Sequence, residues 1–133
     1  MSEEHAVFPR LFQFSDVALL CLRLIVAVVF FDSGRRHASD PVGRAASIGL
    51  SPGVTRLLGL AEIAAALGVA LGVFTQVAAL GLMAIMAGSI QKKVFVWHTG
   101  FWGDKAHGWH YDLLFFVASL VILTTGGGRL VLV

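Results

Sequence analysis

Charged residues are scarce in this 133-residue chain, at 14% of the total, whereas 57% of the residues are hydrophobic. Soluble domains carry about 25% charged and about 45–50% apolar residues. The single cysteine, Cys21, cannot form an internal disulfide, which excludes a disulfide-stapled secreted module. The ten Lys and Arg residues form no continuous basic stripe, so we expect no nucleic-acid partner. The composition predicts a small polytopic membrane protein in contact with a lipid bilayer.

Long apolar segments make up most of the chain, and each carries at most one charged residue. They cover residues 17–31, 57–74, 77–90 and 111–125. Together with its flanking residues, each segment has a length close to the roughly 20 residues that a helix needs to cross about 30 Å of hydrocarbon. None alternates between polar and apolar residues, and Leu, Ala and Gly are common in all of them. Helices are therefore favoured over barrel strands.

A buried globular bundle is the alternative for segments of this length. A soluble bundle needs a polar stripe along each helix, and these segments have isolated polar residues instead. We therefore predict an all-α fold: a polytopic membrane four-helix bundle with a very short second turn at 75–76 and longer first and third connections at 32–56 and 91–108. In this interpretation residues 1–15 form an N-terminal interfacial tail, and residues 16–133 form the four-helix transmembrane domain.

The distribution of basic residues predicts the orientation. With four spans, the first and third connections share one side of the membrane. They hold Arg35, Arg36, Arg44, Arg56, Lys92, Lys93 and Lys105. The other side holds Arg10 and Arg129. Because basic loops stay in the cytoplasm, we expect both connections to be cytoplasmic and both termini outside, in the cytoplasmic membrane of a prokaryotic cell.

Arg23 and Glu62 are charged residues well inside the first and second apolar segments. A charge at mid-helix costs roughly 2.5–3.5 kcal/mol on insertion scales, so neither is expected to face lipid alone. Arg23 lies about 15 Å of helix before Ser33, and Glu62 about 12 Å after Val54, measured from the same side. We therefore expect Arg23 and Glu62 to pair. Such a pair would lock two helices in register or offer a polar contact to a ligand or a proton.

A second group of polar residues gathers at the mouth of the predicted bundle, on the side of the first and third connections. It contains Asp32, Arg35, Arg36, His37, His98, His107, His110 and Asp112. Histidine at a membrane surface can bind a metal, move a proton or donate a hydrogen bond to a quinone carbonyl. No cysteine accompanies these histidines and no His-Glu-x-x-His motif occurs, so we expect no metal site. A hydrogen-bonding cluster without chemistry and a pocket for a polar headgroup both stay open.

Small residues in the second and third segments favour close approach of helices. They are Gly59, Ala65, Ala66, the Gly68-x-x-x-Gly72 spacing, Ala84 and Gly88. They predict tight packing within the bundle or against a larger complex.

Several short motifs together resemble the DoxX family of small four-helix membrane proteins. The resemblance covers residues 17–132 and begins with Leu22-Arg23-Leu24 and Phe30-Phe31-x-Ser33-Gly34-Arg35-Arg36. It continues with Gly49-Leu50-Ser51-Pro52, Gly59-x-x-Glu62, the Gly-rich hairpin 71–75, the stretch 83–87 with His98, and Gly126-x-Gly128-Arg129 with Leu132.

This resemblance implies a place in membrane redox chemistry. Members of the family are linked to thiosulfate:quinone oxidoreductase as a small subunit, to quinone or catechol detoxification, and to redox enzymes for thiols and superoxide. By analogy, the chain is an accessory or small subunit of a quinone-linked redox system and possesses a quinone site. Arg23 and Glu62 would be the family's buried polar pair, with His98 and Arg36 bordering the quinone headgroup region. His110 and Asp112 complete the candidate ligand-binding residues.

Two other functions stay open at this point. The first is a structural or assembly subunit that docks a larger complex, or a second copy of the chain, without ligand chemistry of its own. The second is a small transporter or proton path, although the chain shows no inverted repeat and no broken helix.

Overall fold

The computed structural model describes residues 6–103 and 108–131. Its helices, in chain order, are the 3-10 helix η2 (Pro9–Phe14), α1 (Ser15–Ser39), α2 (Pro41–Ile48), α3 (Pro52–Leu71), α4 (Thr75–Gln91), the π-helical turn η3 (Lys92–Val96) and α5 (Trp109–Thr125). No β-strand occurs in these two described stretches. The predicted all-α fold is therefore confirmed.

Four of these helices are apolar over most of their length. Three helical stretches are long enough to cross a membrane: Pro9–Ser39, Pro52–Leu71 and Thr75–Val96. The fourth, α5, has 17 residues, or about 26 Å at ~1.5 Å per residue. That is slightly less than the about 30 Å of a typical hydrocarbon layer. Large apolar side chains remain exposed on the outward faces, as contact with lipid requires. The chain is a multi-pass membrane protein.

The first connection is longer than the second, as predicted, but most of it is helical. α1 continues to Ser39, and α2 begins after a single residue, Asp40. The extension is stabilised by Asp32, which forms ion pairs with Arg35 at 3.2 Å and Arg36 at 3.0 Å. Opposite charges three and four residues apart support a helix. Asp40 then caps α2 by accepting a hydrogen bond from the backbone N–H of Gly43.

The turn between α3 and α4 is short, as predicted, and lies just before residues 75–76, which begin α4. At the other end of α3, Ser51 caps the helix by accepting a hydrogen bond from the N–H of Val54 at 3.2 Å. Gly72 ends α3 in the left-handed conformation with φ of 74°. Glycine is favoured there because it has no Cβ to clash in that conformation.

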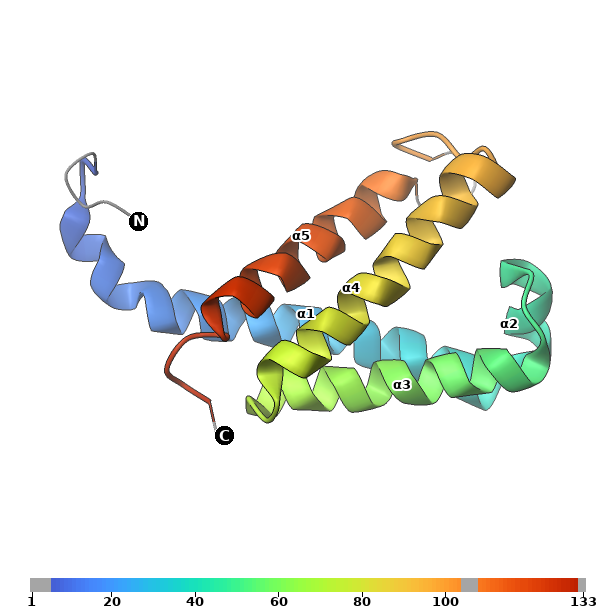
Figure 1. Cartoon of the computed structure of the whole chain (residues 1–133), viewed down its shortest axis with the longest axis horizontal. Coiled ribbons are helices and arrows are strands. Elements are labelled where there is room, and N and C mark those ends of the chain that lie inside the picture. Colours follow the sequence, from blue (N-terminus) through green and yellow to red (C-terminus); the bar gives the residue numbers. More distant parts are fainter. Residues whose placement is uncertain (1–5, 104–107, 132–133) are drawn as a thin grey trace.

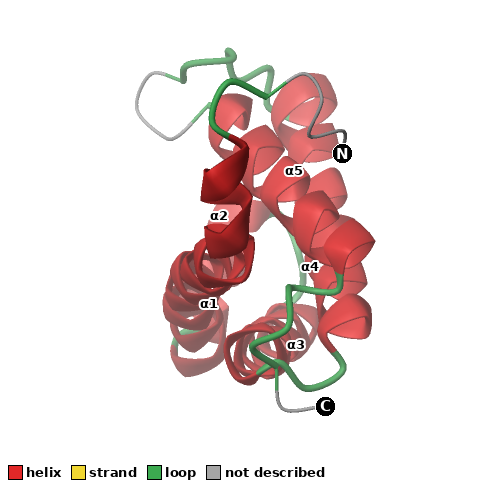
Figure 2. Cartoon of the chain, turned by 90° about the vertical axis from the view of Figure 1, so that its left-hand side faces the viewer, coloured by secondary structure: helices red, strands yellow, loops and turns green. Residues whose placement is uncertain are grey.

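The long helices form two pairs that meet at one end of the molecule and diverge at the other. α1 lies against α3, and α4 lies against α5 (Figure 1). The pairs are joined by the short α3–α4 turn and separate toward the end that carries α2, as Figure 1 shows. The end-on view shows α1 beside α3 and α4 beside α5 (Figure 2). The core lies where they meet. It contains Val26, Ala27, Phe30, Ala66, Val69, Ala79, Leu82, Met86 and Ile122.

The N-terminal segment before α1 exposes apolar side chains beside polar ones. Val7, Phe8, Leu11 and Phe14 are all exposed, and η2 contributes no buried residue. An apolar face of this kind suits the boundary between headgroups and acyl chains. The division of the chain into an interfacial tail at 1–15 and a four-helix domain at 16–133 stays a prediction.

The α1–α3 contact depends on two glycines that bring the backbones together. A Cβ added at Gly34 would lie 2.6 Å from the carbonyl oxygen of Gly59. A Cβ added at Gly59 would lie 2.6 Å from the oxygen of Gly34 and from the backbone nitrogen of Ala38. No methyl group fits at these distances, so the two helices can approach this closely only without side chains at these positions.

We expect Gly34→Ala to destabilise the protein by about 1–3 kcal/mol, because the added methyl group overpacks the α1–α3 contact. Thermal unfolding in detergent, followed by circular dichroism, measures the loss. Gly81→Ala is the matched control, since a Cβ at that helical position meets no atom within 4 Å. Equal melting temperatures for the two variants would contradict the close contact.

Candidate functional site

A cavity of about 540 Å³ lies where the two helix pairs diverge. Its walls come from α1, α3, α4, η3 and α5. Leu50, Leu58, Ile85, Met86 and Trp97 form much of its apolar lining. Its polar lining includes Ser33, His37, Glu62, Lys93, Tyr111 and Asp112. Ligand pockets typically have about 300–1,000 Å³ and combine an apolar lining with a few polar groups.

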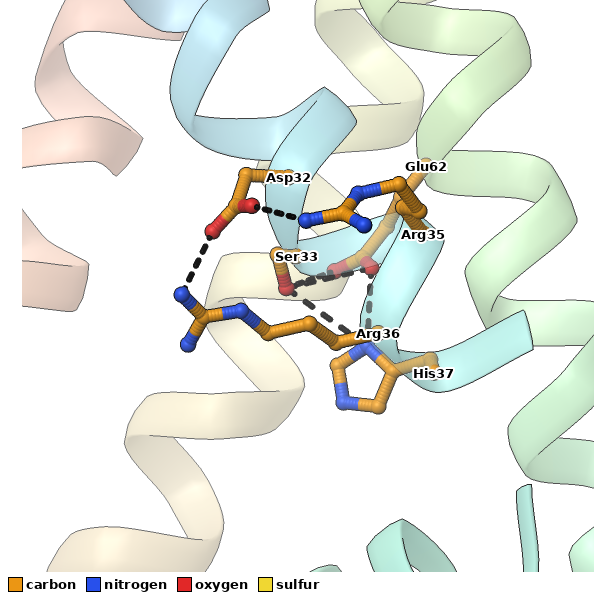
Figure 3. Close-up of polar contacts among 6 residues, drawn as sticks. All are labelled: Asp32, Ser33, Arg35, Arg36, His37 and Glu62. Carbon is orange, nitrogen blue, oxygen red and sulfur yellow. Dashed lines mark hydrogen bonds and ion pairs between the residues drawn. The ribbon is translucent and has the colours of Figure 1, made fainter. Parts of the chain in front are cut away.

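The α1–α3 wall carries a buried carboxylate held by two polar side chains. Nδ1 of His37 lies 3.0 Å from Oε2 of Glu62, and the imidazole donates to the carboxylate when Nδ1 carries a proton (Figure 3). The Ser33 hydroxyl donates to the same carboxylate, at 3.3 Å from Oε2 and 3.4 Å from Oε1. The side chains of His37 and Glu62 are only 12% and 3% exposed. Glu62 is therefore a desolvated carboxylate that borders the cavity.

The wall formed by η3 and α5 carries an ion pair of its own. Nζ of Lys93 lies 2.8 Å from Oδ2 of Asp112, and their side chains are 15% and 3% exposed. The same Nζ lies 5.8 Å from the centre of the Tyr111 ring, within reach of a cation–π contact. Asp112 lies in the first turn of α5, where the helix dipole also favours a negative charge.

Each of these two buried contacts joins the two elements of its own wall. His37–Glu62 connects α1 to α3, and Lys93–Asp112 connects η3 to α5. Neither of these two contacts crosses from one helix pair to the other. A buried charge needs a partner to offset its lost hydration. Glu62 and Asp112 each find that partner within their own wall, and the cavity lies between the two walls.

Arg36 belongs to a neighbouring cavity on the other side of Ser33. Its guanidinium is bound to Asp32, and both residues line a space of about 560 Å³ beside Val28, Val29 and Tyr111. The predicted position of Arg36 at the mouth thus agrees with the structure, although it does not line the cavity that contains Glu62.

The prediction that Arg23 pairs with Glu62 is wrong. Arg23 is completely buried at the opposite end of the molecule, where it donates hydrogen bonds to four carbonyl oxygens. Its Nε binds Val69 at 2.8 Å and its Nη2 binds Ala70 at 3.1 Å. Its Nη1 binds Leu130 at 2.6 Å and, more weakly, Gly127 at 3.4 Å. Arg23 therefore joins α1 to the end of α3 and to the segment after α5.

The two residues lie at different depths because α1 ends later than the apolar segment predicts. α1 runs six residues beyond Ser33, so Arg23 lies about 24 Å from the end of its helix at ~1.5 Å per residue. Glu62 lies only about 15 Å from the start of α3. Arg23 therefore locks helices together, whereas Glu62 borders the cavity, where it can contact a ligand.

Of the predicted mouth histidines that the structure describes, only His37 contacts Glu62. His98 is exposed and is not part of the cavity lining; its φ is 52°. His110 faces the connection before α5, where its Nδ1 lies 2.6 Å from the carbonyl oxygen of Phe101. His107 lies outside the described residues. Among the described residues, no three His, Cys, Asp or Glu side chains are grouped for a metal ion.

Four residues of the cavity lining were not among the predicted ligand-binding residues: Ser33, Lys93, Trp97 and Tyr111. One signal for Lys93 was present, because Asp112 is an acid in an apolar helix and needs a positive partner. Ser33 had no comparable signal. The Ser33 hydroxyl forms its hydrogen bond to Glu62 only because α3 packs beside α1.

The small residues at the end of α3 serve contacts within the chain. A Cβ at Gly68 would lie 3.0 Å from the carbonyl oxygen of Val73, and one at Gly72 would lie 2.7 Å from Nη2 of Arg23. The Gly68-x-x-x-Gly72 spacing thus shapes the α3–α4 turn and admits the guanidinium.

Comparison with known proteins identifies relatives of this chain. A family model described as DoxX matches residues 18–99. An uncharacterized membrane protein of Mycobacterium tuberculosis is 34% identical in an alignment of 127 positions, and the match covers 84% of this chain and 77% of the relative. No solved structure matches the chain.

We expect Arg23→Met to lower the free energy of unfolding by about 2–4 kcal/mol, because the buried carbonyls of Val69, Ala70 and Leu130 would lose their donors. Unfolding in mixed micelles by added dodecyl sulfate, followed by circular dichroism, measures the change. Arg129→Met is the control, since the Arg129 side chain is exposed. A free energy of unfolding equal to that of Arg129→Met would contradict this role of Arg23.

Proposed function

The chain belongs to the DoxX family, and we propose that it is a small membrane subunit of a redox system that binds a quinone in the cavity beside Glu62. The observation that carries this proposal is the buried His37–Glu62 pair, which borders an otherwise largely apolar space of about 540 Å³. Such a space suits a flat ring with polar groups at its edge and a hydrocarbon tail.

The polar groups of the cavity match the chemistry of a quinone headgroup. When bound, a quinone supplies two carbonyl oxygens that take up electrons together with protons. Lys93 and Tyr111 carry N–H and O–H groups that can donate hydrogen bonds to such oxygens. Glu62 can accept a hydrogen bond from a quinol hydroxyl on the same edge. One cavity therefore offers donors for the oxidised form and an acceptor for the reduced form.

His37 has a distinct role in this proposal. Its side chain is more exposed than that of Glu62, and it lies near the end of α1. It orients the Glu62 carboxylate through a bond of 3.0 Å and offers a path for a proton between the mouth and that carboxylate. Ser33 holds the carboxylate from a second side.

The electrons in this system come from a partner enzyme. We place the mouth, with its basic residues, on the cytoplasmic side of the cytoplasmic membrane and both termini outside, in line with the distribution of basic residues. A redox enzyme that docks at the mouth would then meet the quinone at the cytoplasmic surface.

We expect a short-chain quinone such as ubiquinone-1 to quench the fluorescence of Trp97, which lines the cavity. Glu62→Gln and His37→Ala should each weaken binding of the reduced form, ubiquinol-1, roughly tenfold to a hundredfold, because the first removes the charge of the group that accepts from the quinol and the second removes the side chain that orients this group. Titration of the purified protein in lipid nanodiscs measures the dissociation constants. Trp97→Phe shows which part of the quenching arises in the cavity.

His98→Ala is the matched control for this titration, because His98 is a mouth histidine outside the cavity lining. Its dissociation constant should equal that of the unaltered protein. Melting temperatures of all variants separate lost binding from lost folding. Unchanged affinity in both Glu62→Gln and His37→Ala would overturn the quinone site.

A structural or assembly role is the second candidate, and the outward face of α4 favours it. Gly81 is exposed, and a Cβ added there would meet no atom within 4 Å. This glycine therefore does not serve the packing of its own chain, and small residues in membrane helices often allow another helix to approach. The partner would be a helix of a larger complex or of a second copy.

We expect Gly81→Leu to release such a partner during native purification, since the larger side chain would block close approach while the fold is kept. Mass measurement of the complex in mild detergent reports the loss. Gly53→Leu, with equally open space at the start of α3, is the control. A monomer before any substitution would rule out this role.

A further inference from the structure

The second cavity, of about 560 Å³, lies on the face where α1 and α5 separate. Val28 and Val29 of α1 form its apolar end. Asp32 and Arg36, one and two turns farther along α1, border its polar end together with Lys93 of η3. Ser33, Lys93 and Tyr111 also line the cavity that contains Glu62, so the two spaces share a wall.

The polar end of this cleft has an excess of positive charge. Asp32 is shared by two arginines, with Arg35 at Oδ1 and Arg36 at Oδ2. Lys93 is already balanced by Asp112. One acid thus faces two guanidinium groups, and Arg36 is the one of them that lines the cleft.

The guanidinium of Arg36 retains donors for a further anion. Its Nη2 binds Asp32 at 3.0 Å, and the other terminal nitrogen lies on the side of the guanidinium away from this carboxylate (Figure 3). A guanidinium has five N–H donors in a fixed fork, and this geometry matches the oxygens of a phosphate.

The depth of the cleft matches the boundary between acyl chains and headgroups. Arg36 follows Asp16, near the start of α1, by about 20 residues, or about 30 Å of helix. This is the thickness of a typical hydrocarbon layer. Val28 and Val29 then lie at the level of acyl chains, and Val28 is exposed on the outside of the bundle.

We propose that the α1–α5 cleft binds an anionic phospholipid, with its phosphate on Arg36 and an acyl chain along Val28 and Val29. The positive excess selects an anionic headgroup, and the apolar end selects a lipid over a soluble anion. The bound lipid would cover the side of the wall formed by Ser33, Lys93 and Tyr111. This site is separate from the quinone site and does not depend on it.

The test compares Arg36→Gln with Arg35→Gln in protein that carries phosphatidylglycerol or phosphatidylcholine. The control is closely matched, because both arginines are paired with Asp32 and their side chains are 59% and 64% exposed. Native mass spectrometry from mixed micelles gives the lipid affinity. We expect the unaltered protein to retain phosphatidylglycerol over phosphatidylcholine, and Arg36→Gln to lose about fivefold in affinity, the equivalent of one cationic contact. Arg35→Gln should stay within about twofold.

Three results would overturn the proposal. Equal retention of the two lipids by the unaltered protein would remove its selectivity. Equal losses in both variants would indicate a diffuse effect of surface charge. Displacement of the lipid by inorganic phosphate at a matching affinity would identify a site for a free anion. Quenching of Trp97 by ubiquinone-1 in each variant reports the other cavity, so a failure here is distinguishable from a failure of the quinone site.

Discussion

The hydrogen bonds of Arg23 are the constraint on which the architecture depends. A guanidinium buried in an apolar bundle has to satisfy its N–H groups, and it does so on carbonyls that have no partner of their own. Val69 and Ala70 belong to the last turn of α3, where a positive charge also complements the helix dipole. Leu130 lies beyond α5. One side chain of α1 thus fixes α3 and the C-terminal segment together.

Convergence at the Arg23 end leaves the helix pairs apart at the other end. The three successive glycines after α5, all with positive φ, let the chain fold back over Arg23, and a Cβ at Gly127 would lie only 3.0 Å from its Cδ. At the diverging end, His37–Glu62 and Lys93–Asp112 each stabilise one pair. The cavity beside Glu62 opens between walls whose buried carboxylates already have partners. This arrangement supports a ligand that is amphipathic.

Much of the fold and part of the site could be predicted from the sequence. The apolar segments, the short second turn and the burial of Glu62 follow from composition and from the cost of a lone charge in lipid. The partner of Glu62 could not be predicted from composition or from the cost of a lone charge. Ser33 and His37 lie beside Glu62 because α1 continues as a helix past the apolar segment, a continuation that the Asp32 ion pairs support. The positions of His98 and His110 depend on the path of the third connection, for which no hydrophobic periodicity predicts a structure.

The sequence by itself determined that this chain is helical, that it crosses a membrane, and that its buried charges need partners, because these properties depend on local composition and on the low polarity of lipid. Only the tertiary structure decided which partner each charge found. Arg23 binds carbonyls and Glu62 binds an imidazole because the relative shift of α1 against α3 is set by the contact of Gly34 with Gly59. Such a shift depends on contacts between residues far apart in the chain, and segment lengths alone do not encode it.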